Sequence, residues 1–208
     1  MNNKWKILIS LFVIAMTSVA GIILWDKLPA QLPVHFNLNN EPDNFMPKAG
    51  AVFGIPAFLI AIQLLCLLDT HIQFKKNGQI RKYLPYIIWL VPAIAMFVMG
   101  SIIMFSLDIK FNLTLFVTVF LGVLFVILGN VMPKVTQNMI FGIRIYWTLK
   151  NEDNWFHTHR VGGFAFVIGG LLMIFTSLME NIYITTALLI AMAITPIAYS
   201  WIYALRHK

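Results

Sequence analysis

Six long apolar segments constrain the fold of this chain more than any other feature. A run of about 20 apolar residues can cross the hydrocarbon core of a bilayer as a helix. Of the 208 residues, 60% are hydrophobic and only 11% are charged, whereas soluble domains usually have about 25% charged residues. The sequence therefore predicts an all-α integral membrane protein with six transmembrane helices, spanning roughly residues 7–25, 49–68, 84–105, 113–128, 164–178 and 182–205.

The basic residues indicate how these helices are oriented. With the N-terminus in the cytoplasm, twelve of the 15 lysines and arginines fall in inner segments and the remaining three, Lys27, Lys48 and Lys110, in outer segments. This bias follows the positive-inside rule, so we expect a multi-pass protein with both termini in the cytoplasm. The net charge of +7 is then a sign of topology, with some attraction to anionic lipid headgroups, and not of direct nucleic-acid binding.

The first apolar segment begins like a secretory signal peptide. Lys4 and Lys6 precede it, and residues 18–20 (Ser-Val-Ala) resemble a cleavage site. The apolar run nevertheless continues without a break to Trp25, beyond any such site. We therefore expect an uncleaved membrane anchor.

Loops of unequal length suggest three sections. Residues 1–68 form a two-helix unit with a long outer loop, 26–48. Residues 69–112 hold an inner connector, the third span and a short outer loop. Residues 113–208 hold spans four to six and a long inner loop, 129–160.

The outer loop combines an extended segment with turn residues. Residues 34–36 (Val-His-Phe) have strand-like character, and residues 39–43 (Asn-Asn-Glu-Pro-Asp) are typical of a turn. These side chains could hydrogen-bond the loop into a compact cap, contact a ligand or peptide, or form a metal or acid–base cluster from the histidine and the two acids. The cap is the favoured interpretation; the candidate residues are His35, Phe36, Asn37, Glu41 and Asp43.

A helix is expected to run from the end of the inner loop into the fifth span. Asn151 is a candidate N-cap, followed by two acids in the first turn, where the positive end of a helix favours them. Trp155, His159 and Gly163 are spaced four apart and share one face. The pairs Gly162-Gly163 and Gly169-Gly170 form a stripe of small residues that another span can approach closely.

Amide, guanidinium, imidazole and indole groups concentrate along the inner loop, in contrast to the apolar spans. Such groups suit recognition of a partner at the membrane surface. Two alternatives stay open: the aromatic residues could anchor the loop at headgroup depth, and the arginine could reach a lipid phosphate. The candidate partner-binding residues are Asn138, Phe141, Gly142, Arg144, Trp147, Thr148, Trp155, His159 and Arg160.

Few residues have the spacing that catalysis requires. His157 and His159 are a weak zinc signal, because they lack a third spaced ligand and point to different faces of a helix. The single cysteine, Cys66, lies inside an apolar run, which argues against a thiolate cluster. We therefore expect no enzyme activity, no cofactor and no bound metal.

The interiors of the spans contain no ionisable residue; Asp69 and Asp108 lie at span ends. Ion-coupled carriers usually need such residues within the membrane, so coupled transport is disfavoured. A passive transporter or a lipid-handling membrane protein is the alternative function.

The two long loops resemble the SdpI family of bacterial membrane proteins. The inner loop carries the series Asn138, Phe141-Gly142-Ile143-Arg144, Trp147-Thr148-Leu149, Trp155 and His159-Arg160 before Gly163. The outer loop carries Pro33-x-His35-Phe36-Asn37 and Glu41-Pro42-Asp43, similar to a short domain of unknown function at the N-terminus of many members. Two positions depart from the family pattern: Ile145-Tyr146 stand where Thr-Pro is usual, and Asn40 stands where glycine is usual.

This resemblance implies a protein of the bacterial cell membrane that gives immunity to a secreted peptide toxin. It also implies that, in some members, the toxin-occupied protein holds a cytoplasmic autorepressor of winged-helix type at the membrane. The outer loop would then sense the toxin or serve a structural role, and the inner loop would offer the docking surface. The expected partners are the lipid bilayer, the peptide toxin and the autorepressor.

Overall fold

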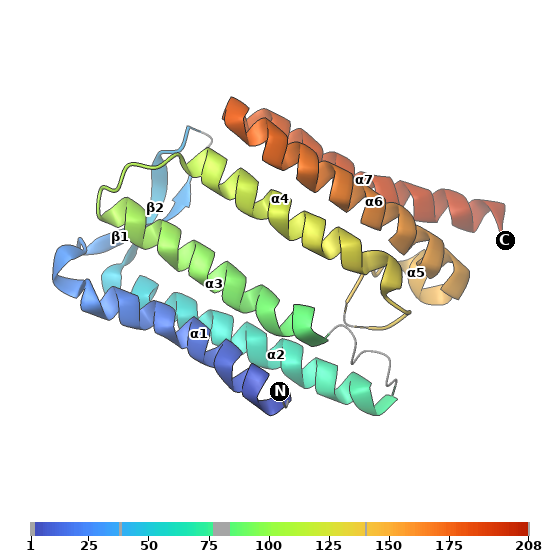
Figure 1. Ribbon diagram of the computed structural model, residues 1–208, viewed down its shortest axis with the longest axis horizontal. Helices are drawn as coiled ribbons and strands as arrows, with labels where there is room; N and C mark the ends of the chain where they lie inside the picture. Colours follow the sequence, from blue (N-terminus) through green and yellow to red (C-terminus); the bar gives the residue numbers. More distant parts are fainter. Residues whose placement is uncertain (1–2, 38, 77–83, 140, 208) are drawn as a thin grey trace. The chain divides into compact units, whose positions relative to one another are not determined.

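The structure is a computed structural model and describes residues 3–37, 39–76, 84–139 and 141–207. Contacts between residues divide the chain into two compact units, described separately below. The first unit holds α1, β1, β2, α2 and α3, and the second holds α4 to α7 (Figure 1). The third span thus lies in the first unit.

Within the described residues, six helices are long and apolar enough to cross a membrane. This number confirms the prediction from the apolar runs. The fifth helix begins at Glu152, after the predicted N-cap Asn151, and so extends well before residue 164, where its apolar run was placed. The six spans are Lys4–Ile23, Gly50–Leu68, Leu84–Ser106, Leu113–Lys134, Glu152–Met179 and Ile182–Arg206.

The helices of the first unit are α1 (Asn3–Ile23), α2 (Ile55–Lys76) and α3 (Leu84–Ser106). A short π-helical turn, η2 (Gly50–Gly54), leads into α2. Helices α1 and α3 pack along each other around a buried cluster of small and branched apolar side chains. The cluster consists of Ile14, Val91 and Ala95, with Leu59, Ile60 and Ile62 of α2 packed against it.

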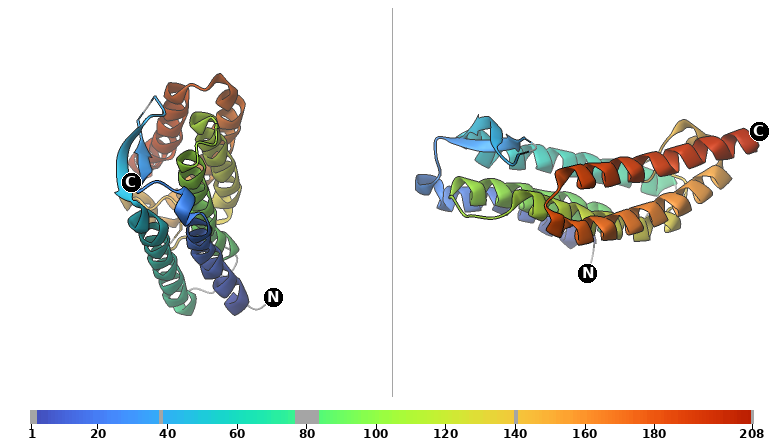
Figure 2. Two further views of the ribbon diagram at one scale, coloured as in Figure 1. Left: turned by 90° about the vertical axis from the view of Figure 1, so that its left-hand side faces the viewer. Right: turned by 90° about the horizontal axis from the view of Figure 1, so that it is seen from above.

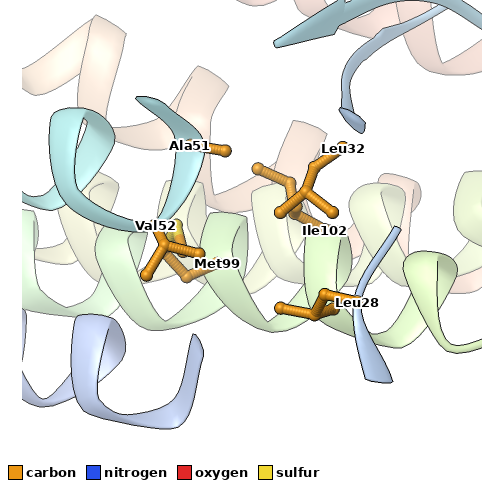
Figure 3. Packing of buried hydrophobic residues seen from close by; sticks show 6 residues of the cluster. All are labelled: Leu28, Leu32, Ala51, Val52, Met99 and Ile102. Carbon is orange, nitrogen blue, oxygen red and sulfur yellow. The ribbon is translucent and has the colours of Figure 1, made fainter. Parts of the chain in front are cut away.

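The outer loop folds into an antiparallel hairpin of β1 (Gln31–Phe36) and β2 (Pro42–Pro47). The protein is mostly helical, but the predicted all-α class was wrong in leaving out this sheet. The strand-like character of residues 34–36 was the signal for it. The hairpin is anchored on a buried cluster that joins it to η2 and α3 (Figure 3), formed by Leu28, Leu32, Ala51, Val52, Met99 and Ile102.

A lysine holds the base of the hairpin to the end of α1. Nζ of Lys48 donates to the carbonyl oxygens of Trp25 at 2.9 Å and Leu28 at 3.1 Å, and lies 4.7 Å from the centre of the Trp25 ring. The ammonium group therefore adds donors to two backbone carbonyls of the turn that follows α1 and ties this turn to the end of β2.

One polar side chain connects all three helices of the first unit. Nε2 of Gln63 in α2 donates to Oγ of Ser10 in α1 at 3.2 Å and to the carbonyl oxygen of Ile88 in α3 at 3.0 Å. Four residues after Ile88, Pro92 lies inside α3 and has no N–H to donate to that carbonyl. Gln63 therefore supplies the hydrogen bond that Pro92 removes from the helix.

The second unit contains α4 (Leu113–Val131), the 3₁₀ turn η4 (Met132–Lys134), α5 (Tyr146–Lys150), α6 (Glu152–Thr176) and α7 (Ile182–Arg206). Helix α7 runs back along α6 and ends beside α5 (Figure 2). The turn between α6 and α7 is short, with Glu180 in a left-handed conformation (φ 52°). Asn181 caps α7 by accepting from the N–H of Tyr183 at 3.0 Å.

The glycine pairs of α6 lie at helix contacts, as predicted. An added Cβ at Gly163 would lie 2.8 Å from the carbonyl oxygen of Gly129 in α4, and one at Gly170 would lie 2.5 Å from that of Gly122. On the adjacent side of α6, an added Cβ at Gly169 would lie 2.5 Å from Cγ of Met192 in α7. The small residues therefore let α6 approach both α4 and α7 closely.

Candidate functional site

The inner loop is built around two stacked rings on the first turns of α6. The rings of Trp155 and His159 lie one helical turn apart, with centroids 4.0 Å apart and planes inclined by 19°. Both residues are only 1% exposed. The indole Nε1 of Trp155 donates to the carbonyl oxygen of Val135 at 2.7 Å, so the stack holds the start of the loop against α6.

The imidazole of His159 closes the loop from its other side. Its Nδ1 lies 2.8 Å from the carbonyl oxygen of Trp155, and its Nε2 lies 2.8 Å from the backbone nitrogen of Ile143. A carbonyl can only accept and a backbone N–H can only donate. The proton is therefore on Nδ1, Nε2 accepts from Ile143, and His159 is a neutral structural residue.

Gly142 makes this close contact sterically feasible. Its φ of +130° is a conformation that glycine adopts readily and other residues avoid. An added Cβ would overlap Nε2 of His159 and would lie 3.0 Å from Cζ2 of Trp155. The glycine in the motif is thus required both by the backbone and by the stacked rings beneath it.

Two further predicted residues fold the loop onto itself. Nδ2 of Asn138 donates to the carbonyl oxygen of Phe141 at 3.0 Å, while its Oδ1 accepts from the N–H of Phe141 at 2.8 Å. The hydroxyl of Thr148 donates to the carbonyl oxygen of Ile143 at 2.7 Å and accepts from the N–H of Ile145 at 3.1 Å. Both side chains are buried, so they position the loop.

The residues available to a partner form a smaller set. Arg144 and Arg160 are exposed, whereas Phe141 and Trp147 are half-buried. The structure thus divides the predicted partner-binding residues into a buried group that shapes the loop and a more accessible group of two exposed arginines and two half-buried aromatic residues. We call Phe141, Arg144, Trp147 and Arg160 the inner surface.

The candidate list from the sequence omitted several residues that build this site. Gln137 donates through Nε2 to the carbonyl oxygens of Thr148 at 2.7 Å and Leu149 at 3.0 Å, near the end of α5. Asn154 is buried and bonds Ser200 of α7: its Nδ2 donates to the Ser200 carbonyl at 2.9 Å, and its Oδ1 accepts from Oγ at 2.7 Å. A polar residue on the buried face of a membrane helix could have signalled this contact.

The outer-loop candidates mainly stabilise the hairpin. Oδ1 of Asn37 accepts from the N–H groups of Asn39 at 2.9 Å and Glu41 at 3.0 Å, and Asn40 has a left-handed conformation (φ 63°), which asparagine tolerates. The ring of Phe36 packs edge-to-face on Phe105 of α3, with centroids 4.8 Å apart. These contacts confirm the compact cap.

An exposed pair remains on the hairpin surface. Nδ1 of His35 lies 2.5 Å from Oδ1 of Asp43, while the carboxylate of Glu41 accepts from Nδ2 of Asn37 at 3.2 Å. Among the residues that the structure describes, no three histidine, cysteine or acidic side chains are grouped closely enough to hold a metal ion. The predicted role of these residues in sensing a toxin stays a prediction.

Comparisons with known proteins agree with the organisation of the two loops. Residues 134–200 match the sequence model of the SdpI/YfhL protein family, and residues 12–60 match that of DUF1648, a domain of unknown function. Immunity protein SdpI of Bacillus subtilis (strain 168) is 26% identical over 186 residues, which cover 89% of this chain and 87% of that protein. No solved structure matches the chain. The chain is therefore a membrane protein with an SdpI/YfhL family region behind a DUF1648 region, which confirms the resemblance to the SdpI family predicted from its loops.

Proposed function

We propose that this protein is a membrane immunity protein that gives the cell resistance to a secreted peptide toxin. The observation that carries this proposal is the similarity to Immunity protein SdpI, which extends along 89% of this chain and includes both loops.

A finer part of the proposal concerns the inner surface. Arg144 and Arg160 are exposed, and Phe141 and Trp147 are half-buried. Buried hydrogen bonds hold the conformation of the loop before α6. Interfaces are enriched in aromatic residues and arginine, and a preorganised loop loses little entropy on binding. We assign this surface to docking of a cytoplasmic autorepressor, with both chain termini on the same side of the membrane.

Immunity is tested by survival. Cells that lack the protein and cells that express it are exposed to the peptide toxin secreted by neighbouring bacteria of the same kind, and surviving colonies are counted. Expression is expected to raise survival at least tenfold. Equal survival at equal, verified membrane abundance would reject immunity as the function.

Docking is tested separately with Arg144→Ala and Arg160→Ala. Each is expected to reduce membrane recruitment of a fluorescently labelled repressor several-fold while membrane abundance stays normal, because both side chains are exposed. Lys27→Ala is the matched control, since it removes an exposed basic residue from the first unit. Unchanged recruitment in both arginine variants would reject docking at the inner surface without bearing on immunity.

A further inference from the structure

A small pocket lies within the second unit, between α5, the start of α6 and the end of α7. Its volume is about 170 Å³, and its lining includes Tyr146, Trp147, Lys150, Asn154, Tyr203 and His207. The right-hand view of Figure 2 shows the end of α7 beside the segment that holds α5. Three aromatic rings and two basic side chains therefore share a concave surface, of which only Trp147 also belongs to the inner surface.

Lys150 provides the pocket with a positive charge. Its Nζ donates to the hydroxyl of Tyr146 at 2.6 Å and lies 4.5 Å from the centre of the same ring. Among the described residues, no carboxylate lies within ion-pair distance of this ammonium group. The phenol takes one of its three N–H donors, so the charge is held in place while donors remain for a ligand.

His207 lies at the opposite side of the pocket in a fixed orientation. Its Nδ1 lies 3.0 Å from the carbonyl oxygen of Tyr203, and its ring stacks on that of Tyr203 with centroids 4.1 Å apart and planes inclined by 16°. The second ring nitrogen, Nε2, consequently faces away from the helix backbone. Arg206 adds an exposed positive charge in the last turn of α7.

The acidic side chains nearest in sequence do not line this pocket. Glu152 and Asp153 are exposed on the first turn of α6, and neither belongs to the pocket lining. The lining thus carries the charge of Lys150 and no carboxylate, and it is complementary to an anion.

The length of α7 places the pocket near the membrane surface. Its 25 residues rise about 37 Å at about 1.5 Å per residue, whereas the hydrocarbon core of a bilayer is about 30 Å thick. The helix is therefore about 7 Å longer than the core, and the basic Arg206 in its last turn favours its C-terminal end as the end that reaches the phospholipid phosphates. Tyrosine and tryptophan are also enriched at that depth.

We propose that this pocket binds the phosphate group of an anionic phospholipid headgroup. Nζ of Lys150 contacts the phosphate oxygens, and the rings of Tyr146, Trp147, Tyr203 and His207 enclose the headgroup. Binding ties α5 to the end of α7 and so steadies the segment that precedes α6. A lysine binds phosphate as a point charge, so the site recognises the charge of the headgroup more than its shape.

The test uses the full-length protein in detergent and native mass spectrometry. Titration with phosphatidylglycerol is expected to show a saturable first bound lipid, with much weaker binding of phosphatidylcholine. Lys150→Gln should weaken that first binding about tenfold, as expected for the loss of a charged hydrogen bond. Ala204→Phe, which keeps every charge and fills the pocket that Ala204 lines, should abolish it.

Lys134→Gln is the matched control, because Lys134 is an exposed lysine of the same unit that does not line the pocket. It should bind phosphatidylglycerol as the unmodified protein does. Titration with inorganic phosphate distinguishes a lipid headgroup from free phosphate as the ligand. If inorganic phosphate binds in a way that depends on Lys150 and phosphatidylglycerol does not bind, the pocket is a phosphate site for a soluble ligand and the lipid is rejected. Equal phosphatidylglycerol binding in the unmodified protein, Lys150→Gln and Ala204→Phe would overturn the proposal.

Discussion

At the scale of single residues, Gly142 shows how tightly the inner loop is packed onto α6. Its backbone has φ +130°, and the rings of Trp155 and His159 occupy the space where a side chain would lie. We expect Gly142→Ala to lower the free energy of unfolding by about 2 kcal/mol or more, since backbone strain and steric overlap act together. Thermal unfolding in detergent measures this loss.

Trypsin cleavage reports where the loss occurs. Lys134, Arg144 and Lys150 are exposed, so loosening of the loop in Gly142→Ala should accelerate cleavage between α4 and α6. Gly100→Ala is the matched control, because an added Cβ there meets nothing within 4 Å and alanine favours helix. Wild-type stability and cleavage of Gly142→Ala would contradict the packing described for this loop.

At the scale of elements, α3 depends on a side chain from another helix. Pro92 leaves the carbonyl of Ile88 without its helical donor, and Nε2 of Gln63 replaces that donor at 3.0 Å. We expect Gln63→Leu to destabilise the first unit by about 1 kcal/mol, the usual scale of polar contacts between membrane helices. Unfolding by SDS in mixed micelles measures the change.

A double-mutant cycle isolates this contact. Pro92→Ala restores an N–H at position 92, so the carbonyl of Ile88 regains a partner within α3. Gln63→Leu should then cost less in the Pro92→Ala background than in the unmodified protein. Strictly additive effects of the two substitutions would show that Gln63 does not compensate for the proline.

The sequence predicted the elements better than it predicted the state of individual side chains. The apolar runs, the N-cap Asn151 and the glycine pairs of α6 depend on local spacing, and the structure confirms all three. Burial of Trp155 and His159 depends on contacts with residues 135 and 141–143, which local spacing does not encode. The same sequence pattern fits a tryptophan that lies at headgroup depth and a tryptophan that is buried beneath a folded loop.

At the scale of the whole molecule, the predicted orientation has a direct chemical test. Lys27 and Lys134 are both exposed. The chain crosses three candidate spans between them, Gly50–Leu68, Leu84–Ser106 and Leu113–Lys134, and Lys134 is the last residue of the third span. An odd number of crossings puts the two residues on opposite sides of the membrane. In a Cys66→Ser background, we expect Lys27→Cys to react with a membrane-impermeant maleimide in intact cells and Lys134→Cys to react only after permeabilisation.

The controls make the labelling experiment decisive about topology as well as orientation. The Cys66→Ser protein without an added cysteine sets the background, because Cys66 is the single cysteine of the chain. Reaction of both variants in intact cells would contradict three crossings between them. Reaction of Lys134→Cys alone would keep the crossings but reverse the orientation, placing the inner surface outside the cell, where a cytoplasmic repressor could not reach it.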